Sequence, residues 1–347
     1  MLMRTHLRSC FAAVFLLPMI VAASPGRADG EVNLYSFRQP QLIEPLLRRF
    51  GDETGTKVNV VYAEKGLLER LKAEGDNSPA DVVLTADVGN LNDMVEAGVL
   101  QPVRSKVLEA NIPAQYRDPE GRWFGLTLRA RVIYASKERV KPGEVARYED
   151  LADPKFRDRV CSRSGKHVYM VSLIASVIAS DGEQRAEQWL EGVKNNLARK
   201  PQGNDRSQAK AIHEGECDLA LANTYYYGAM QSKPDERAWA EAVTLVFPNQ
   251  ADRGAHVNVS GAAVTKAAKN RDNAVRLLEY LSGEEAQRIY AEENFEYPVK
   301  PGVPLSPVVA AWGSFKPDSI PLVEVARERA AASRLVDRIG FDEAGGS

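Results

Sequence analysis

The chain has 347 residues, with 45 basic and 47 acidic side chains and a formal net charge of −2. This length suits two domains better than one. The charge balance argues against nucleic acid as the main partner, because phosphate binding needs a basic surface. Three cysteines and four histidines are too few for a Cys/His-rich metal protein, but three of the 12 tyrosines are consecutive.

The first 28 residues have the pattern of a secretory signal peptide. Basic residues precede the apolar stretch Phe11–Ala23, and the small residues Gly26 and Ala28 predict cleavage before Asp29. A membrane anchor is the alternative, since the uncharged stretch is near the lower length limit for a span, but Pro18 and the Gly26-x-Ala28 end favour cleavage. Cleavage removes three arginines and no acid, which changes the formal charge from −2 to −5. We therefore expect a soluble mature protein in the periplasm.

The mature chain keeps two cysteines, Cys161 and Cys217. An even pair in an oxidising compartment is typical of a disulfide. The closed loop of about 56 residues is worth roughly 4 kcal/mol in the chain-entropy treatment. Two buried thiols are the alternative.

The first third of the chain alternates between strands and helices. Short apolar or β-branched runs predict strands at 31–35, 57–62 and 81–85, and apolar residues at helical spacing predict helices at 42–50, 66–73 and 91–97. This βαβαβ order predicts a parallel sheet covered by helices.

The pattern restarts in the rest of the chain. Strands are predicted at 123–128, 131–136, 159–162, 218–222, 243–247 and 262–265, and helices at 169–180, 207–214, 271–282, 284–294 and 323–339. Two α/β lobes in an exported protein predict a hinged cleft, with the ligand beyond the carboxyl ends of the strands. Four such ends are recognisable, at 36–38, 86–87, 164–169 and 223–227.

Tyrosines follow two of these strand ends. The triplet 225–227 follows one end, and Tyr169 follows another. Cys161 lies eight residues before Tyr169, and Cys217 lies eight residues before Tyr225. A disulfide between the cysteines would hold the two strands in parallel register, so both sets of tyrosines would emerge at the same edge.

Clustered phenols point to a hard, trivalent metal ion. Phenolate oxygen ligates iron in some proteins, and by ligand-softness reasoning it suits Fe(III). Ionising a tyrosine at pH 7 costs about 4 kcal/mol, so three phenolates need a highly charged cation. An added anion such as carbonate would leave the site negative, and Arg38, Arg129 and Arg131 lie near the strand ends to balance it. The alternatives are aromatic packing for the tyrosines and surface charge for the arginines.

Signatures of catalysis are weak in this chain. The sequence contains no G-x-S-x-G motif, no Walker A loop and no G-x-G-x-x-G loop. Lone histidines such as His167 and His256 are more often structural than ligands. An exported hydrolase with an unrecognised site is therefore a minor alternative to a binding protein.

Over nearly the whole mature length, the chain resembles periplasmic ferric-iron-binding proteins, the substrate-binding components of Fe(III) ABC importers. The matching stretches are VNLYSFRQPQLIEPLL, ADVVLTADVGNL, WFGLTLRARVIYASKERV, HVYMVSLIAS, GECDLALANTYYYG, RGAHVNVSGAAVTKAAKN and LSPVVAAWGSFKPD. The tyrosine pair after Asn-Thr is the most informative of these motifs.

The resemblance implies that Tyr225, Tyr226 and Tyr169 are the metal ligands, with Tyr227 packing beside them. Many members of the family add a histidine from the first lobe, and some add a tyrosine or glutamate. Here Arg38 is followed by Gln39-Pro40, and Ala86 stands where some members have glutamate. The chain is thus similar to the subgroup with three tyrosine ligands, completed by carbonate, another small anion or water.

By the same resemblance, Arg38 and Arg129 contact the anion, and Gln39 and Arg131 are weaker candidates. The family fold is the two-lobed type II periplasmic-binding-protein fold. It implies that lobe one comprises 29–128 and 253–303, and that lobe two comprises 129–252 and 304–347.

The expected function is capture rather than catalysis. Iron would dock on lobe two, lobe one would close over it, and a monomer would present both lobes to an inner-membrane permease. Acid would promote release, because protons compete for phenolates. A same-fold protein that binds an organic or inorganic anion through Arg38, Arg129 and Arg131 is the main alternative, and ferrous iron in vivo remains a further one.

Overall fold

The computed structural model describes residues 30–63 and 65–344. The predicted signal peptide lies outside the described residues. Within them, no helix is long and apolar enough to cross a membrane.

The described strands join into one network, in the order β2-β1-β3-β8-β4-β6-β5, with β7 and β9 also paired to β4. Its strands are β1 Gly30–Ser36, β2 Thr56–Tyr62, β3 Val82–Thr85, β4 Phe124–Ser136, β5 Val160–Cys161, β6 Leu219–Asn223, β7 Val243–Val246, β8 Val257–Val264 and β9 Tyr297–Pro298. β1 runs parallel to both β2 and β3, as the βαβαβ pattern predicts. β5 runs parallel to β6, and β4 and β8 run antiparallel to their neighbours.

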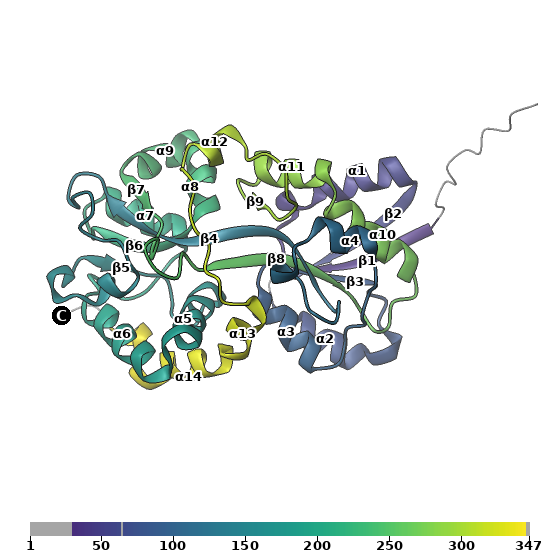
Figure 1. The fold of residues 1–347 in the computed structure, drawn as a ribbon, viewed down its shortest axis with the longest axis horizontal. Helices are drawn as coiled ribbons and strands as arrows, with labels where there is room; N and C mark the ends of the chain where they lie inside the picture. The colour runs from purple at the N-terminus through teal and green to yellow at the C-terminus, as the bar shows by residue number, and fades with distance from the viewer. Residues whose placement is uncertain (1–29, 64, 345–347) are drawn as a thin grey trace, which may run out of the picture.

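The buried apolar residues form three clusters that divide the molecule into two halves. We call lobe one the elements around the first cluster, and lobe two those around the second and third. The helices of lobe one are α1 Glu44–Thr54, α2 Leu67–Glu74, α3 Val88–Glu96, α4 Lys106–Asn111, α10 Arg271–Leu281, α11 Glu284–Glu293 and α12 Pro307–Ala310. Those of lobe two are α5 Val168–Asp181, α6 Glu183–Asn195, α7 Asp205–His213, α8 Thr224–Gln231, α9 Pro234–Glu241 and α14 Arg329–Ile339. In both lobes helices cover the two faces of the sheet (Figure 1).

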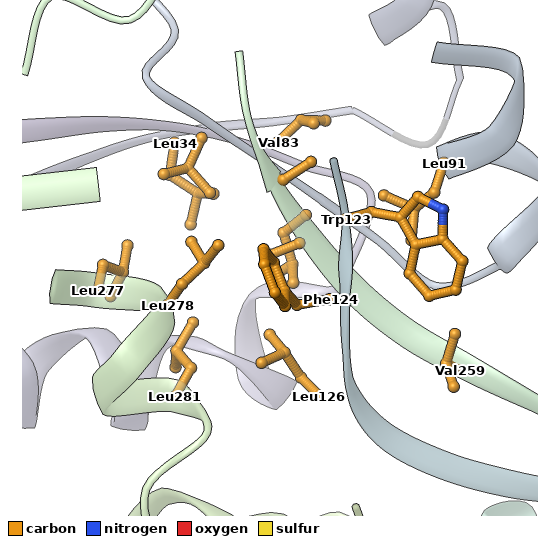
Figure 2. Packing of buried hydrophobic residues seen from close by; sticks show 14 of the residues in the cluster. Leu34, Val83, Leu91, Trp123, Phe124, Leu126, Val259, Leu277, Leu278 and Leu281 are labelled. Carbon is orange, nitrogen blue, oxygen red and sulfur yellow. The ribbon is translucent and has the colours of Figure 1, made fainter. Parts of the chain in front are cut away.

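The core of lobe one lies where the central strands meet α10. Phe124 and Leu126 of β4 pack with Leu278 and Leu281 of α10 and with Val259 of β8 (Figure 2). Apolar residues on both faces of these strands explain why the sheet is covered on both sides.

β4 is one strand of 13 residues rather than the two strands predicted at 123–128 and 131–136. Phe124 and Leu128 belong to the first cluster, whereas Ile133 belongs to the second and Tyr134 to the third. The strand therefore crosses from lobe one to lobe two. The prediction was wrong because two arginines interrupt the apolar run, yet both are buried and hydrogen-bonded.

Two other boundaries also differ from the predictions. β8 begins at Val257, five residues before the predicted strand, because its polar residues Asn258 and Ser260 are buried and hydrogen-bonded. The final helix, predicted at 323–339, is divided at Glu328 into α13 Leu322–Arg327 and α14.

The helices α4, α6, α9 and α12 and the short strand β9 were not predicted. The lobe boundaries remain a prediction. In the tail, Val309 and Leu322 pack with the first cluster and Leu335 packs with the second.

Candidate metal centre

The tyrosine triplet stands at the junction of β6 and α8. The strand ends at the extended residue Asn223, and α8 begins at Thr224, which puts Tyr225 and Tyr226 in the first turn. Asn223 is the N-cap by position, but its side chain makes no cap hydrogen bond. Instead, its Oδ1 accepts a hydrogen bond from Arg131 Nη1 at 3.2 Å.

Tyr169 occupies the equivalent place in the first turn of α5. The N-cap of this helix is His167, whose Nδ1 accepts a hydrogen bond from the Tyr169 backbone N–H at 3.2 Å. Burial lowers the pKa of His167 to about 3, and the nearby Arg163 adds to this effect. A neutral imidazole is what such a cap needs, because the capping nitrogen must keep its lone pair.

The predicted disulfide between Cys161 and Cys217 is confirmed. It ties β5, where Cys161 pairs with Ala220, to the segment that enters β6. The two strands that precede the tyrosines are therefore parallel and cross-linked, as the spacing predicts.

The three predicted ligands converge on one cavity of about 110 Å³. The hydroxyl oxygens of Tyr169 and Tyr225 lie 3.3 Å apart, within hydrogen-bond distance. The rings of Tyr225 and Tyr226 stack with their centroids 4.2 Å apart. The other residues that line the cavity are Phe37, Arg38, Gln39, Leu42, Ala86, Arg129, Ser260 and Glu296.

The phenols of this cavity resist ionisation in the absence of a cation. Burial raises the pKa of Tyr225 well above its usual value, and the neighbouring phenols of Tyr169 and Tyr226 raise it further. Burial raises the pKa of Tyr226 to about 12, with added repulsion from Tyr169 and Asp205. At neutral pH both side chains are therefore protonated, and only a strongly positive ion can displace their protons.

Arg38 faces the tyrosines from lobe one and is already paired with a carboxylate. Its two Nη atoms donate to the Glu296 carboxylate at 3.1 and 2.8 Å, and Nη1 also donates to Ser260 Oγ at 2.5 Å. Burial opposes the charge of Arg38, but Glu296 outweighs it and raises the guanidinium pKa. Arg38 thus brings little net charge to the cavity.

Arg129 differs from Arg38 because it makes no ion pair in the described part of the chain. Its Nη1 donates to Ser260 Oγ at 3.1 Å, its Nη2 donates to the Ala86 carbonyl, and its Nε has no hydrogen-bond partner. The side chain is 2% exposed, and its guanidinium carbon lies 5.3 Å from the ring centroid of Tyr169. An unpaired buried cation next to the phenols favours the entry of an anion.

Arg131 does not line the cavity with the tyrosines. Its Nη1 donates to Asp205 Oδ2 at 2.6 Å, and its Nη2 donates to the Leu221 carbonyl at 3.1 Å. Arg163 Nη1 donates to the other carboxylate oxygen of Asp205 at 2.9 Å. Asp205 in turn accepts from the backbone N–H of Asn223, so this network holds the end of β6 in place.

The remaining predicted residues have simpler environments. Gln39 is exposed at the cavity, and its Oε1 accepts from Gln41 Nε2 at 2.6 Å. His256 is buried, and its Nε2 shares a hydrogen bond with Ser172 Oγ at 3.1 Å. The Tyr227 ring points to Trp312, with 5.9 Å between the centroids.

Sequence reasoning missed four residues of this centre, namely Ser260, Glu296, Arg163 and Asp205. Each acts through a contact that is distant in sequence, such as the 258-residue separation between Arg38 and Glu296. The one sequence signal for Ser260 is that it is a polar residue within the mainly apolar strand β8. Among the described residues, no group of three or more His, Cys, Asp or Glu side chains could hold a metal ion.

Residues 77–311 match the family model described as a bacterial extracellular solute-binding protein. The chain belongs to this family. It is 47% identical over 324 residues to iron uptake protein A1 of Synechocystis, covering 92% of this chain and 90% of that protein. A family of solute-binding proteins is not one of enzymes, which removes the support for the hydrolase alternative.

Solved structures agree with this assignment. The apo ferric ion-binding protein A of Pasteurella haemolytica is 52% identical, with a TM-score of 0.87, and the match covers 90% of this chain and 98% of that one. The Trichodesmium protein IdiA (FutA), in complex with iron and citrate, is 46% identical, with a TM-score of 0.85 over 90% and 100% of the two chains. The predicted two-lobed periplasmic-binding-protein fold is thereby confirmed.

Proposed function

We propose that the protein captures Fe(III) in the periplasm, after removal of its signal peptide, and delivers it as a monomer to an inner-membrane ABC permease. The convergence of Tyr169, Tyr225 and Tyr226 on one cavity is the observation that carries this proposal. The names of the relatives, an iron uptake protein and ferric ion-binding proteins, support the choice of metal.

Three phenolates neutralise the charge of Fe(III) and offer it the hard oxygen donors that it prefers. Their protons leave when the metal binds, so the affinity falls as the pH falls. This chemistry suits a carrier, because acidification or transfer to the permease releases the ion without breaking a covalent bond.

A small anion completes the coordination in this proposal. Arg129 is its main contact, because it forms no ion pair in the described chain, whereas Arg38 is paired with Glu296 and is a secondary contact. Carbonate fits the charge balance, and the citrate bound with iron in the Trichodesmium relative supports a carboxylate as well. Arg131 and Gln39 receive less support, since Arg131 is paired with Asp205 and Gln39 is exposed.

The direct test is the visible spectrum of iron-free protein during titration with ferric nitrilotriacetate. We expect an orange-red phenolate-to-iron charge-transfer band that saturates at one iron per protein and disappears on addition of a strong chelator. Protein that stays colourless with bound iron would contradict tyrosine ligation.

Calorimetry distinguishes the proposed iron capture from the alternative function, in which the protein binds an anion without iron. Iron-free protein is titrated with carbonate, citrate and phosphate, and we expect weak binding that becomes tight only after ferric iron is added. Tight binding of any of these anions without iron would favour the alternative function.

A further inference from the structure

Helix α8 makes an unusually close contact with lobe one at Gly228. Gly228 lies three residues after Tyr225 in this helix. A β-carbon at position 228 would stand 2.7 Å from Cβ and 2.8 Å from Cδ1 of Phe295, and closer still to its Cγ. These separations are far shorter than the contact distance of two carbon atoms, so the ring can lie here only because residue 228 is glycine.

Phe295 itself has a backbone conformation that its side chain disfavours. It follows the end of α11 with a φ of 57°, in the left-handed region where helix-ending glycine or asparagine is usual and a bulky residue is an outlier. Gly228 is also locally unfavourable, because alanine is the better residue inside a helix.

A bulky residue thus occupies the left-handed position where glycine is usual, and a glycine occupies the helical position where alanine is better. These two residues touch each other. Sequences usually agree with local preference, and violations concentrate where tertiary structure or function requires them. Because the two violations meet in one contact, a single requirement, the close approach of Phe295 to α8, accounts for both.

This contact joins the two sides of the candidate metal centre, the side with Arg38 and Glu296 and the side with the tyrosines of α8. Phe295 packs against the core of lobe one and directly precedes Glu296, the partner of Arg38. Gly228 belongs to α8, the helix of lobe two that carries Tyr225 and Tyr226.

A chain of aromatic rings runs beside this contact. Tyr227 lies 5.9 Å from Trp312, and Trp312 lies 6.3 Å from Tyr297, measured between ring centroids. Tyr227 packs with the third cluster, in lobe two, whereas Tyr297 and Trp312 pack with lobe one. The third tyrosine of the triplet therefore supports the same link between the lobes.

We infer that Phe295 and Gly228 are a positioning pair that keeps lobe one closed against α8 and thereby slows the release of the bound metal. This inference rests on the proposed function and extends it. The pair touches neither the metal nor the anion. It acts by holding Glu296 and Arg38 of lobe one opposite the tyrosines.

The test is the rate at which iron-loaded protein loses its colour to an excess of chelator. In Gly228→Ala we expect the charge-transfer band to keep its position, since all three tyrosines remain, while release becomes about tenfold faster because closure is weakened. Small-angle scattering should also give the iron-loaded variant a larger radius of gyration than the iron-loaded wild type. Gly51→Ala, in helix α1 away from the cavity, is the matched control and should release iron at the wild-type rate.

A second variant, combined with Gly228→Ala, distinguishes a specific effect of the contact between residues 228 and 295 from a general loss of stability. Phe295→Gly removes both the ring and the β-carbon that would stand 2.7 Å from a β-carbon at position 228. It should therefore also accelerate release, and adding Gly228→Ala to it should produce no further change. Equal acceleration by Gly228→Ala in both backgrounds, or none in the wild type, would overturn the inference. A wild-type protein that never develops the ferric colour would instead overturn the proposed function.

Discussion

The two walls of the metal cavity are built in different ways. The tyrosine wall comes from the first turns of α5 and α8, which follow two parallel, disulfide-linked strands of one lobe. The arginine wall combines Arg38, Arg129 and Glu296, which come from segments far apart in the chain. The first wall is complete within lobe two, whereas the second depends on how lobe one sits against it.

This difference separates the two tasks of a carrier. In the proposed function, a preformed set of phenols would receive the cation before the lobes close, and the charged wall would then shield it and supply the anion contact. Changes in the tyrosine wall should therefore abolish binding, and changes in the arginine wall should only weaken it.

The largest effect is expected from Tyr225→Phe combined with Tyr226→Phe. Loss of a group that merely hydrogen-bonds a metal ligand costs 10–100-fold in affinity, so loss of two ligands should cost at least about 10⁴-fold. Competition with a chelator of known strength measures this loss. Tyr227→Phe, in the same helical turn, is the control and should keep both colour and affinity. A double variant that binds as tightly as the wild type would remove the distinction between the walls.

The next largest effect is expected from replacing Cys161 and Cys217 together by alanine. Removing the cross-link between cysteines 56 residues apart should lower the free energy of unfolding by about 4 kcal/mol, because the unfolded chain gains entropy. Denaturant titration of iron-free protein measures this change. Iron affinity should also fall, because β5 and β6 lose the link that aligns their tyrosines. Unchanged affinity despite the lost stability would show that the tyrosine wall does not depend on the disulfide.

On the arginine wall, Arg129→Lys should lower iron affinity by about 10–100-fold and reduce its dependence on added carbonate. Lysine keeps the charge but not the planar set of donors that contacts Ser260 and Ala86. Arg131→Lys is the informative comparison, since it perturbs the Asp205 pair outside the cavity and should lower thermal stability more than carbonate dependence. A larger loss of carbonate dependence in Arg131→Lys than in Arg129→Lys would show that Arg131 contacts the anion.

The smallest effect is expected from His167→Ala. Loss of the N-cap should cost about 1 kcal/mol of stability, seen as a small decrease in the melting temperature. The ferric band should keep its position and intensity, because His167 supports α5 without ligating the metal. A shifted band would make this histidine part of the tyrosine wall.

The same contrast explains how much the sequence could predict. The tyrosine wall depends on local order, in which two strands are each followed by a tyrosine at an equal distance from a cysteine, and this order was predicted. The arginine wall depends on pairings such as Arg38 with Glu296 that no local pattern encodes. Arg129 and Arg131 also misled the prediction of β4, because a buried arginine with partners looks like a strand break in the sequence.

Proton release on iron binding tests the central claim most directly. Tyr225 and Tyr226 have raised pKa values, and tyrosine ordinarily has a pKa of about 10. Tyr225 and Tyr226 are therefore protonated at pH 7 and must release their protons to the solvent when the metal binds. Each released proton weakens binding by about tenfold for every pH unit of acidification.

The measurement is the number of protons that iron-free protein releases when ferric nitrilotriacetate is added in weak buffer at pH 7. The account predicts that Tyr225→Phe releases one proton fewer than the wild type, and that Tyr227→Phe releases the same number as the wild type. Equal release from the wild type and Tyr225→Phe would contradict the claim that iron is held by the phenolates of this cavity.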